Sequence, residues 1–199
     1  MPRPYRDKIV SMSDKDIFAE RGRSLEEDYF RKKDRELIDK MRKAAAAEQA
    51  RSEMGQKVGI SDPALLGELE GLGFTPDTVV LLPLVPVVQM AWAEGGVSAA
   101  ERALILKLAR SRGIAEGSAA DRKLADWLGQ NPGERVFAQA TRLIRAMLDT
   151  PGQHDLTADD LVKQAEAIAA ASGGILGINK ISAEERQLLA SLAAQLKKN

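Results

Sequence analysis

The sequence of 199 residues contains no cysteine and a single histidine, His154. Without cysteine the chain forms no disulfide bond, performs no thiolate chemistry and offers no cysteine ligand to a metal. One histidine is too few for a histidine-based zinc site within one chain. The sequence also shows no nucleophile–base pair, no metal triad and no cofactor-binding loop. We therefore expect a non-enzymatic protein that uses no organic cofactor.

Aromatic residues and long apolar runs are scarce. Aromatic side chains make up only 4% of the chain, and no stretch alternates apolar and polar residues, so no strand is expected. The longest apolar run, residues 79–93, is interrupted by Pro83 and Pro86 and is shorter than the roughly 20 residues of a membrane span. The first residues lack the apolar segment of a secretion signal. These features predict a cytoplasmic protein with no membrane span.

The chain has no excess of either charge, with 29 basic and 29 acidic residues, so we expect no nucleic-acid partner. The charges are concentrated at one end: residues 1–57 hold 15 basic and 12 acidic side chains, and residues 58–199 hold 14 and 17. This change in composition predicts a disordered tail over 1–12, a charged helical arm over 13–57 and a helical domain over 58–199.

The arm has the composition of one long helix. Ser24 and Glu27 form a capping box, and good helix formers follow without proline up to Met54. Its apolar residues are spaced mostly by three, four or seven, which predicts a narrow apolar stripe on a polar helix; they are Leu25, Tyr29, Phe30, Leu37, Ile38 and Met41. The stripe could bind a protein partner, drive self-association, or belong to a solvated arm that lies on its own domain.

A helix–turn–helix pattern occurs twice in the remaining chain. Gly95 and Gly96 end one helix, and Ser98 and Glu101 form the capping box of the next. Residues 97–109 align with residues 181–193 at an offset of 84, with seven identities in thirteen positions. The sequence therefore predicts an all-α fold: a bundle of about seven helices with two pseudo-repeated helix–turn–helix units, preceded by a long charged N-terminal helix.

The first of these units, AWAEGGVSAAERALILKLARSRGI (91–114), resembles the signature of the TerB-like (tellurite-resistance B) helical domains. The second, ASGGILGINKISAEERQLLASLA (171–193), is similar to the other half of that fold. The resemblance covers roughly residues 75–197. It implies a compact helical bundle without enzymatic activity, linked to bacterial stress responses and to membrane-associated or chaperone-like assemblies.

The resemblance also implies that acidic residues near the turns hold a divalent metal. The matching positions here are Glu94, where the family usually has aspartate, and Ser172, which lacks a carboxylate. Glu94 and Glu101 flank one turn and could share a hard cation, although two glutamates provide fewer oxygens than the six to eight that Ca²⁺ prefers. The competing interpretation gives Glu101 and Glu185 a capping role only.

The turn of the second unit carries Ile175 and Leu176, an apolar pair that we expect to contact a partner. The surrounding glycines follow no strand and precede no Gly-Lys-Ser/Thr, so they do not predict a phosphate site. The first functional hypothesis is thus an interaction module that works through the N-terminal helix. The alternative is a divalent-metal-responsive regulatory domain that uses acidic residues at the helix turns.

Overall fold

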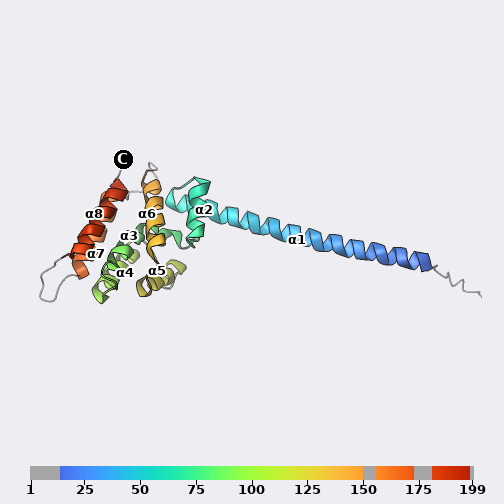
Figure 1. The fold of residues 1–199 in the computed structure, drawn as a ribbon, viewed down its shortest axis with the longest axis horizontal. Coiled ribbons are helices and arrows are strands. Elements are labelled where there is room, and N and C mark those ends of the chain that lie inside the picture. The colour runs from blue at the N-terminus through green and yellow to red at the C-terminus, as the bar shows by residue number, and fades with distance from the viewer. Residues whose placement is uncertain (1–13, 150–155, 173–180, 198–199) are drawn as a thin grey trace, which may run out of the picture. The chain divides into compact units, whose positions relative to one another are not determined.

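The computed structural model describes residues 14–149, 156–172 and 181–197, with side chains described from residue 25 onward. Within these ranges the chain is all-α, as the sequence predicts, and contains no strand (Figure 1). Its elements are α1 (Asp14–Val58), α2 (Pro63–Gly71), the 3-10 helix η1 (Val79–Leu84), α3 (Val85–Ala91), α4 (Ala99–Ser111), α5 (Ala119–Gly129), α6 (Glu134–Leu148), α7 (Ala158–Ser172) and α8 (Ala183–Lys197). None of the described helices is long and apolar enough to cross a membrane. The tail predicted over 1–12 lies outside the described residues.

The chain divides into two units, residues 1–47 and residues 48–199. The sequence places the boundary near residue 58, whereas the structural division falls about three helical turns earlier. The reason is that Met54 and Val58, near the end of α1, are only 1% and 5% exposed and belong to the core of the second unit. One continuous helix therefore contributes to both units.

The last turns of α1 are fixed to the segment that follows them. A Cβ on Gly55 would lie 2.4 Å from the carbonyl oxygen of Ile60, so only glycine allows the backbone to approach this closely. Arg51 donates a hydrogen bond of 2.7 Å to Glu70 of α2. The chain then enters α2 through Asp62, which caps the helix by accepting from the Ala64 N–H, with Pro63 in the first helical position.

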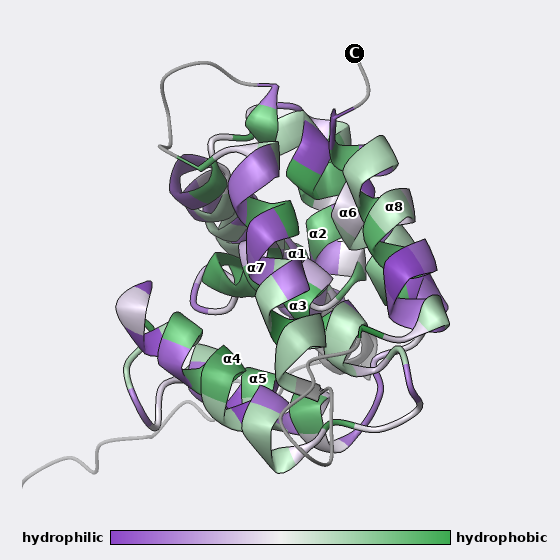
Figure 2. Ribbon diagram, turned by 90° about the vertical axis from the view of Figure 1, so that its left-hand side faces the viewer, coloured by the Kyte–Doolittle hydropathy of each residue, from purple (hydrophilic) through white to green (hydrophobic). Residues whose placement is uncertain are grey.

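The centre of the core is formed by η1 and α3. Proline cannot donate the backbone hydrogen bond of a helix interior, so the sequence predicts a break at Pro83 and Pro86. In the structure the helix type changes between the two prolines, because the 3-10 helix η1 ends at Leu84 and the α-helix α3 begins at Val85. Pro83 lies inside η1, and Pro86 lies in the first turn of α3. Hydrophobic residues occupy nearly all of α3, which contacts α4, α6, α7 and α8 (Figure 2). The apolar composition of this segment therefore reflects burial on every side.

Polar contacts connect α4 and α5 within the second unit. Ser98 and Ser118 cap the two helices. Arg110 of α4 pairs with Asp121 of α5 at 2.6 Å. Arg102 donates to the Leu128 carbonyl, near the end of α5, at 2.6 Å. The serine caps and the Arg102 bond satisfy backbone groups that the helix ends would otherwise leave unpaired, and the Arg110–Asp121 ion pair joins the two helices through their side chains.

Candidate functional site

The apolar residues predicted on the arm are all exposed. Every described residue from Leu25 to Ala46 is exposed to solvent. Large apolar side chains are among them, and their exposed fractions are 72% for Leu25, 58% for Tyr29, 62% for Phe30, 57% for Leu37, 46% for Ile38 and 63% for Met41. In the rest of the described chain, the only other exposed large apolar side chain is Val80, at 38%. Exposed apolar surface in the described chain is therefore concentrated on α1.

The spacing of these residues gathers several of them on one side of the helix. Phe30, Leu37 and Met41 are seven and four residues apart, which are the separations that bring helical side chains onto a common face. Tyr29 and Phe30 contact each other edge to face, with ring centroids 5.9 Å apart. We call the six apolar residues of the preceding paragraph the arm stripe. It offers a partner both aliphatic and aromatic surface.

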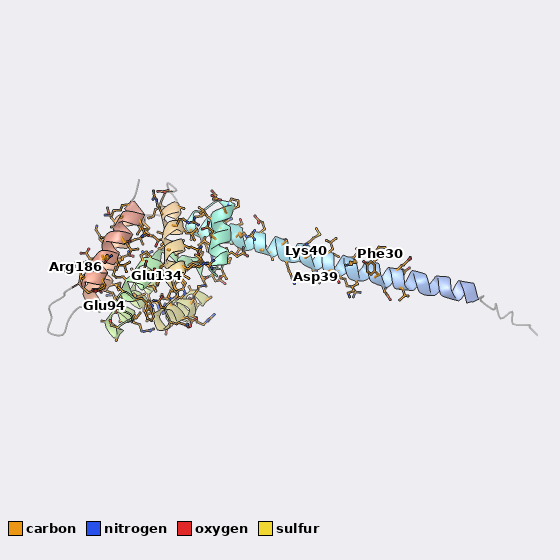
Figure 3. The ribbon with its side chains drawn as sticks, viewed as in Figure 1. Phe30, Asp39, Lys40, Glu94, Glu134 and Arg186 are labelled. Carbon is orange, nitrogen blue, oxygen red and sulfur yellow. The ribbon has the colours of Figure 1, made fainter. Side chains whose placement is uncertain are left out.

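Charged side chains surround the arm stripe. Ion pairs within the helix join Arg31 to Glu27 at 3.2 Å and Lys33 to Glu36 at 3.6 Å. Asp39 and Lys40 lie farther along the same helix as Phe30 (Figure 3). Exposed pairs of this kind contribute only about 0.3–0.5 kcal/mol each to the stability of the helix. They do not cover its apolar residues.

The capping boxes at Ser98/Glu101 and Ser182/Glu185 are present and nearly identical. The box predicted at Ser24 and Glu27 is wrong, because α1 begins at Asp14 and both residues lie inside the helix. Glu101 accepts the Ser98 N–H at 2.7 Å while Ser98 accepts the Glu101 N–H at 3.2 Å. In the second unit, Glu185 accepts the Ser182 N–H at 2.7 Å and Ser182 accepts the Glu185 N–H at 3.1 Å. Glu101 is 3% exposed and Glu185 is 1% exposed. The sequence repeat therefore corresponds to a repeated local structure.

The pKa of Glu101 responds to its burial and to neighbouring carboxylates. Burial raises the pKa of Glu101, the hydrogen bonds from Ser98 oppose this, and the carboxylates of Glu185 and Glu94 raise the pKa further. Glu94, in the turn after α3, is exposed (Figure 3). The tertiary fold thus brings the two turns near each other, although 84 residues separate Glu101 from Glu185.

These acidic residues fit a metal poorly. Across the described ranges, no group of three or more histidine, cysteine, aspartate or glutamate residues could hold an ion. One oxygen of Glu101, Oε2, already accepts the Ser98 N–H. Glu94 and Glu101 therefore offer a hard cation fewer oxygens than it prefers. Ser172, the position that matches Glu94, is the last residue of α7. The turn that follows it, with Ile175 and Leu176, lies outside the described residues, as does His154.

Two further features were missed by the sequence analysis. Lys123 lies over the rings of Phe74 and Trp127, 5.2 and 5.5 Å from their centroids, and burial lowers its pKa. A hollow of about 370 Å³ lies between the end of α1 and the start of α2, and Arg51 and Gly55 are among its lining residues. Both depend on contacts between elements, which no local sequence pattern specifies.

No protein-family model, curated protein or solved structure matches this chain. The resemblance to TerB-like domains consequently rests on the two turn motifs of the sequence. Function has to be inferred from the chain's own residues.

Proposed function

We propose that this protein is a non-enzymatic protein-interaction module of the TerB-like type, in which the arm stripe is the binding surface. The observation that carries the proposal is the exposure of the six apolar side chains of the arm stripe, between 46% and 72%. Phe30, Leu37 and Met41 share one face of the helix, and apolar side chains gathered in this way mark interaction sites more often than apolar residues scattered singly do. The repeated capping boxes support the TerB-like type and, through it, a role in stress responses.

The energetics are consistent with binding through this surface. Complete burial of one large apolar side chain contributes about 1.5–3 kcal/mol. Association costs about 4–15 kcal/mol in lost translational and rotational freedom. Burial of one residue cannot offset that cost, whereas burial of several members of the arm stripe can. The binding partner must therefore cover several helical turns of α1.

A pair of matched double variants tests this proposal. Leu37→Gln with Met41→Gln removes two members of the arm stripe four residues apart. The control is Glu36→Gln with Lys40→Gln. Each of these positions precedes a substituted position of the first variant by one residue, and the control leaves the net charge of the chain unchanged. Both pairs are exposed, and glutamine is a good helix former, so neither should disturb the fold.

The readouts are the solution mass of the full chain by light scattering and quantitative affinity purification from the cells that make it. The proposal expects association, with itself or with an identified protein, that the Leu37/Met41 variant loses and the Glu36/Lys40 variant keeps. If the two variants behave alike in both measurements, the arm stripe is not a binding surface.

The second candidate is a divalent-metal-responsive domain. It is favoured by the electrostatic interaction of Glu101 with both Glu94 and Glu185. This candidate expects millimolar Ca²⁺, Mg²⁺ or Mn²⁺ to raise the melting temperature, and Glu94→Gln to abolish the rise. The exposed Glu116 provides the control, Glu116→Gln. A melting curve that metal leaves unchanged would eliminate this candidate.

A further inference from the structure

The charges of α1 reverse sign around its aromatic pair. Three consecutive acidic residues precede Tyr29 and Phe30, and three consecutive basic residues follow them; the acidic triplet is Glu26, Glu27 and Asp28, and the basic triplet is Arg31, Lys32 and Lys33. All eight residues are helical and exposed. Acid, aromatic and base therefore follow one another within little more than two turns of helix.

The asymmetry extends along the helix on both sides. Residues 14–28 contain six acidic and three basic residues, whereas residues 31–43 contain seven basic and three acidic residues. This part of α1 thus has an acidic half and a basic half of similar length, which meet at the aromatic pair.

This charge order distinguishes between two ways of pairing two copies of the helix. A parallel pair in register places the two acidic halves against each other and the two basic halves against each other, and juxtaposed like charges are unfavourable. An antiparallel pair centred between Tyr29 and Phe30 places the acidic half of each copy beside the basic half of the other. In that arrangement Glu26 is level with Lys33 of the second copy, and Asp28 with Arg31.

The charges needed for such pairing are available in the single chain. Among the residues that the structure describes, Glu26, Asp28 and Lys32 have no ion-pair partner. The pair between Arg31 and Glu27 is 65% and 67% exposed, so water already screens it and exchange for an intermolecular partner costs little.

We propose that the arm stripe binds a second copy of this chain, with the two N-terminal helices antiparallel and centred on Tyr29 and Phe30. This inference rests on the proposed function and names the partner. The paired segments run from about residue 14 to residue 45, roughly 48 Å at 1.5 Å per residue. Aromatic side chains occupy the middle of the contact, and the oppositely charged triplets flank them.

Charge exchange in the full chain tests the pairing. One variant carries Glu26→Lys, Glu27→Lys and Asp28→Lys; a second carries Arg31→Glu, Lys32→Glu and Lys33→Glu; a third carries all six substitutions. Either triple variant places like charges opposite each other, so the dimer dissociation constant should rise by about tenfold or more. The six-fold variant restores opposite charges in the antiparallel pair, so the dissociation constant should return to about the wild-type value.

The direction of the helices can be measured separately. Because the chain has no cysteine, Ala46→Cys at an exposed position of α1 creates a single site for a spin label. In the antiparallel pair the two labels lie about 50 Å apart along the axis, and in a parallel pair about 10 Å apart. Far-ultraviolet circular dichroism of each variant controls for lost helix.

The outcomes separate this inference from the function on which it rests. A long label distance together with rescue by the six-fold variant supports it. A short distance, absence of rescue, or a full-length protein that stays monomeric at its highest soluble concentration would overturn it. In those cases the proposed function still stands if the Leu37/Met41 variant loses a different, identified partner. If the Leu37/Met41 variant keeps every association of the wild-type protein, both the antiparallel pairing and the proposed function are wrong.

Discussion

Glu101 and Glu185 are charged residues that the fold uses for architecture. Each accepts a backbone N–H at the start of its helix, and each is almost completely buried. A buried carboxylate needs hydrogen-bond donors, and the Ser98 and Ser182 N–H groups supply one to each glutamate. The repeated turn motif thus has a structural role that does not depend on any ligand.

The raised pKa of Glu101 gives a testable pH dependence. The folded protein keeps the Glu101 proton to a higher pH than the unfolded chain does. The stability that this group contributes is therefore present below the unfolded value of about 4.3 and is lost as the pH rises through the folded value. Glu101→Gln keeps an acceptor for the Ser98 N–H and does not ionise. We expect this variant to gain stability relative to wild type as the pH rises through that window.

Urea unfolding at a series of pH values from 4 to 7 measures the effect, with the exposed Glu116→Gln as control. The control should follow the wild-type profile. A constant difference between Glu101→Gln and wild type would show that the Glu101 carboxyl titrates alike in the folded and unfolded states.

At the scale of the element, α1 changes its role along its length. Its described residues up to Ala46 are all exposed, whereas Met54 and Val58 belong to the core of the second unit. Helical propensity and ion pairs within the helix maintain the first part. Tertiary burial maintains the last part.

The same substitution in the two parts of α1 should change the free energy of unfolding by very different amounts. Met54, 1% exposed, leaves a cavity when it is replaced, so Met54→Ala should lower the free energy of unfolding by about 2–5 kcal/mol. Met41 is 63% exposed, so Met41→Ala should change the free energy of unfolding by no more than about 0.5 kcal/mol. Urea unfolding of both variants provides the comparison. Equal losses would contradict the division between Ala47 and Glu48.

At the scale of the whole molecule, the proposed binding surface and the core lie in different units. The exposed apolar surface and the charge reversal lie in residues 1–47, and the described core lies in residues 48–199. A change of conditions that acts on surface charge should therefore alter association much more than folding.

Salt provides that change. Raising the ionic strength from about 0.1 M to about 1 M shortens the Debye length from about 10 Å to about 3 Å. Screening weakens the pairing of the oppositely charged triplets, so the dimer dissociation constant should increase. Sedimentation equilibrium of the full chain at both salt concentrations measures it. A dissociation constant that salt leaves unchanged or lowers would mean that apolar contact alone drives association.

The sequence by itself determined the local features of this protein. The all-α class, the change of helix type between Pro83 and Pro86 and the capping boxes at Ser98 and Ser182 all follow from interactions between residues a few positions apart, which local sequence specifies. The apolar residues of the arm were also evident from their spacing. The sequence could not show that they are exposed, because a stripe of this kind is equally suited to a buried helix face.

Only the tertiary structure decided which parts of these elements are buried. It assigned the end of α1 to the core through Met54, placed Glu101 near Glu185, and set Lys123 against two aromatic rings. These contacts join residues that are distant in the sequence, and their geometry depends on how all the helices pack together. The periodicity of a single helix carries no information about that packing.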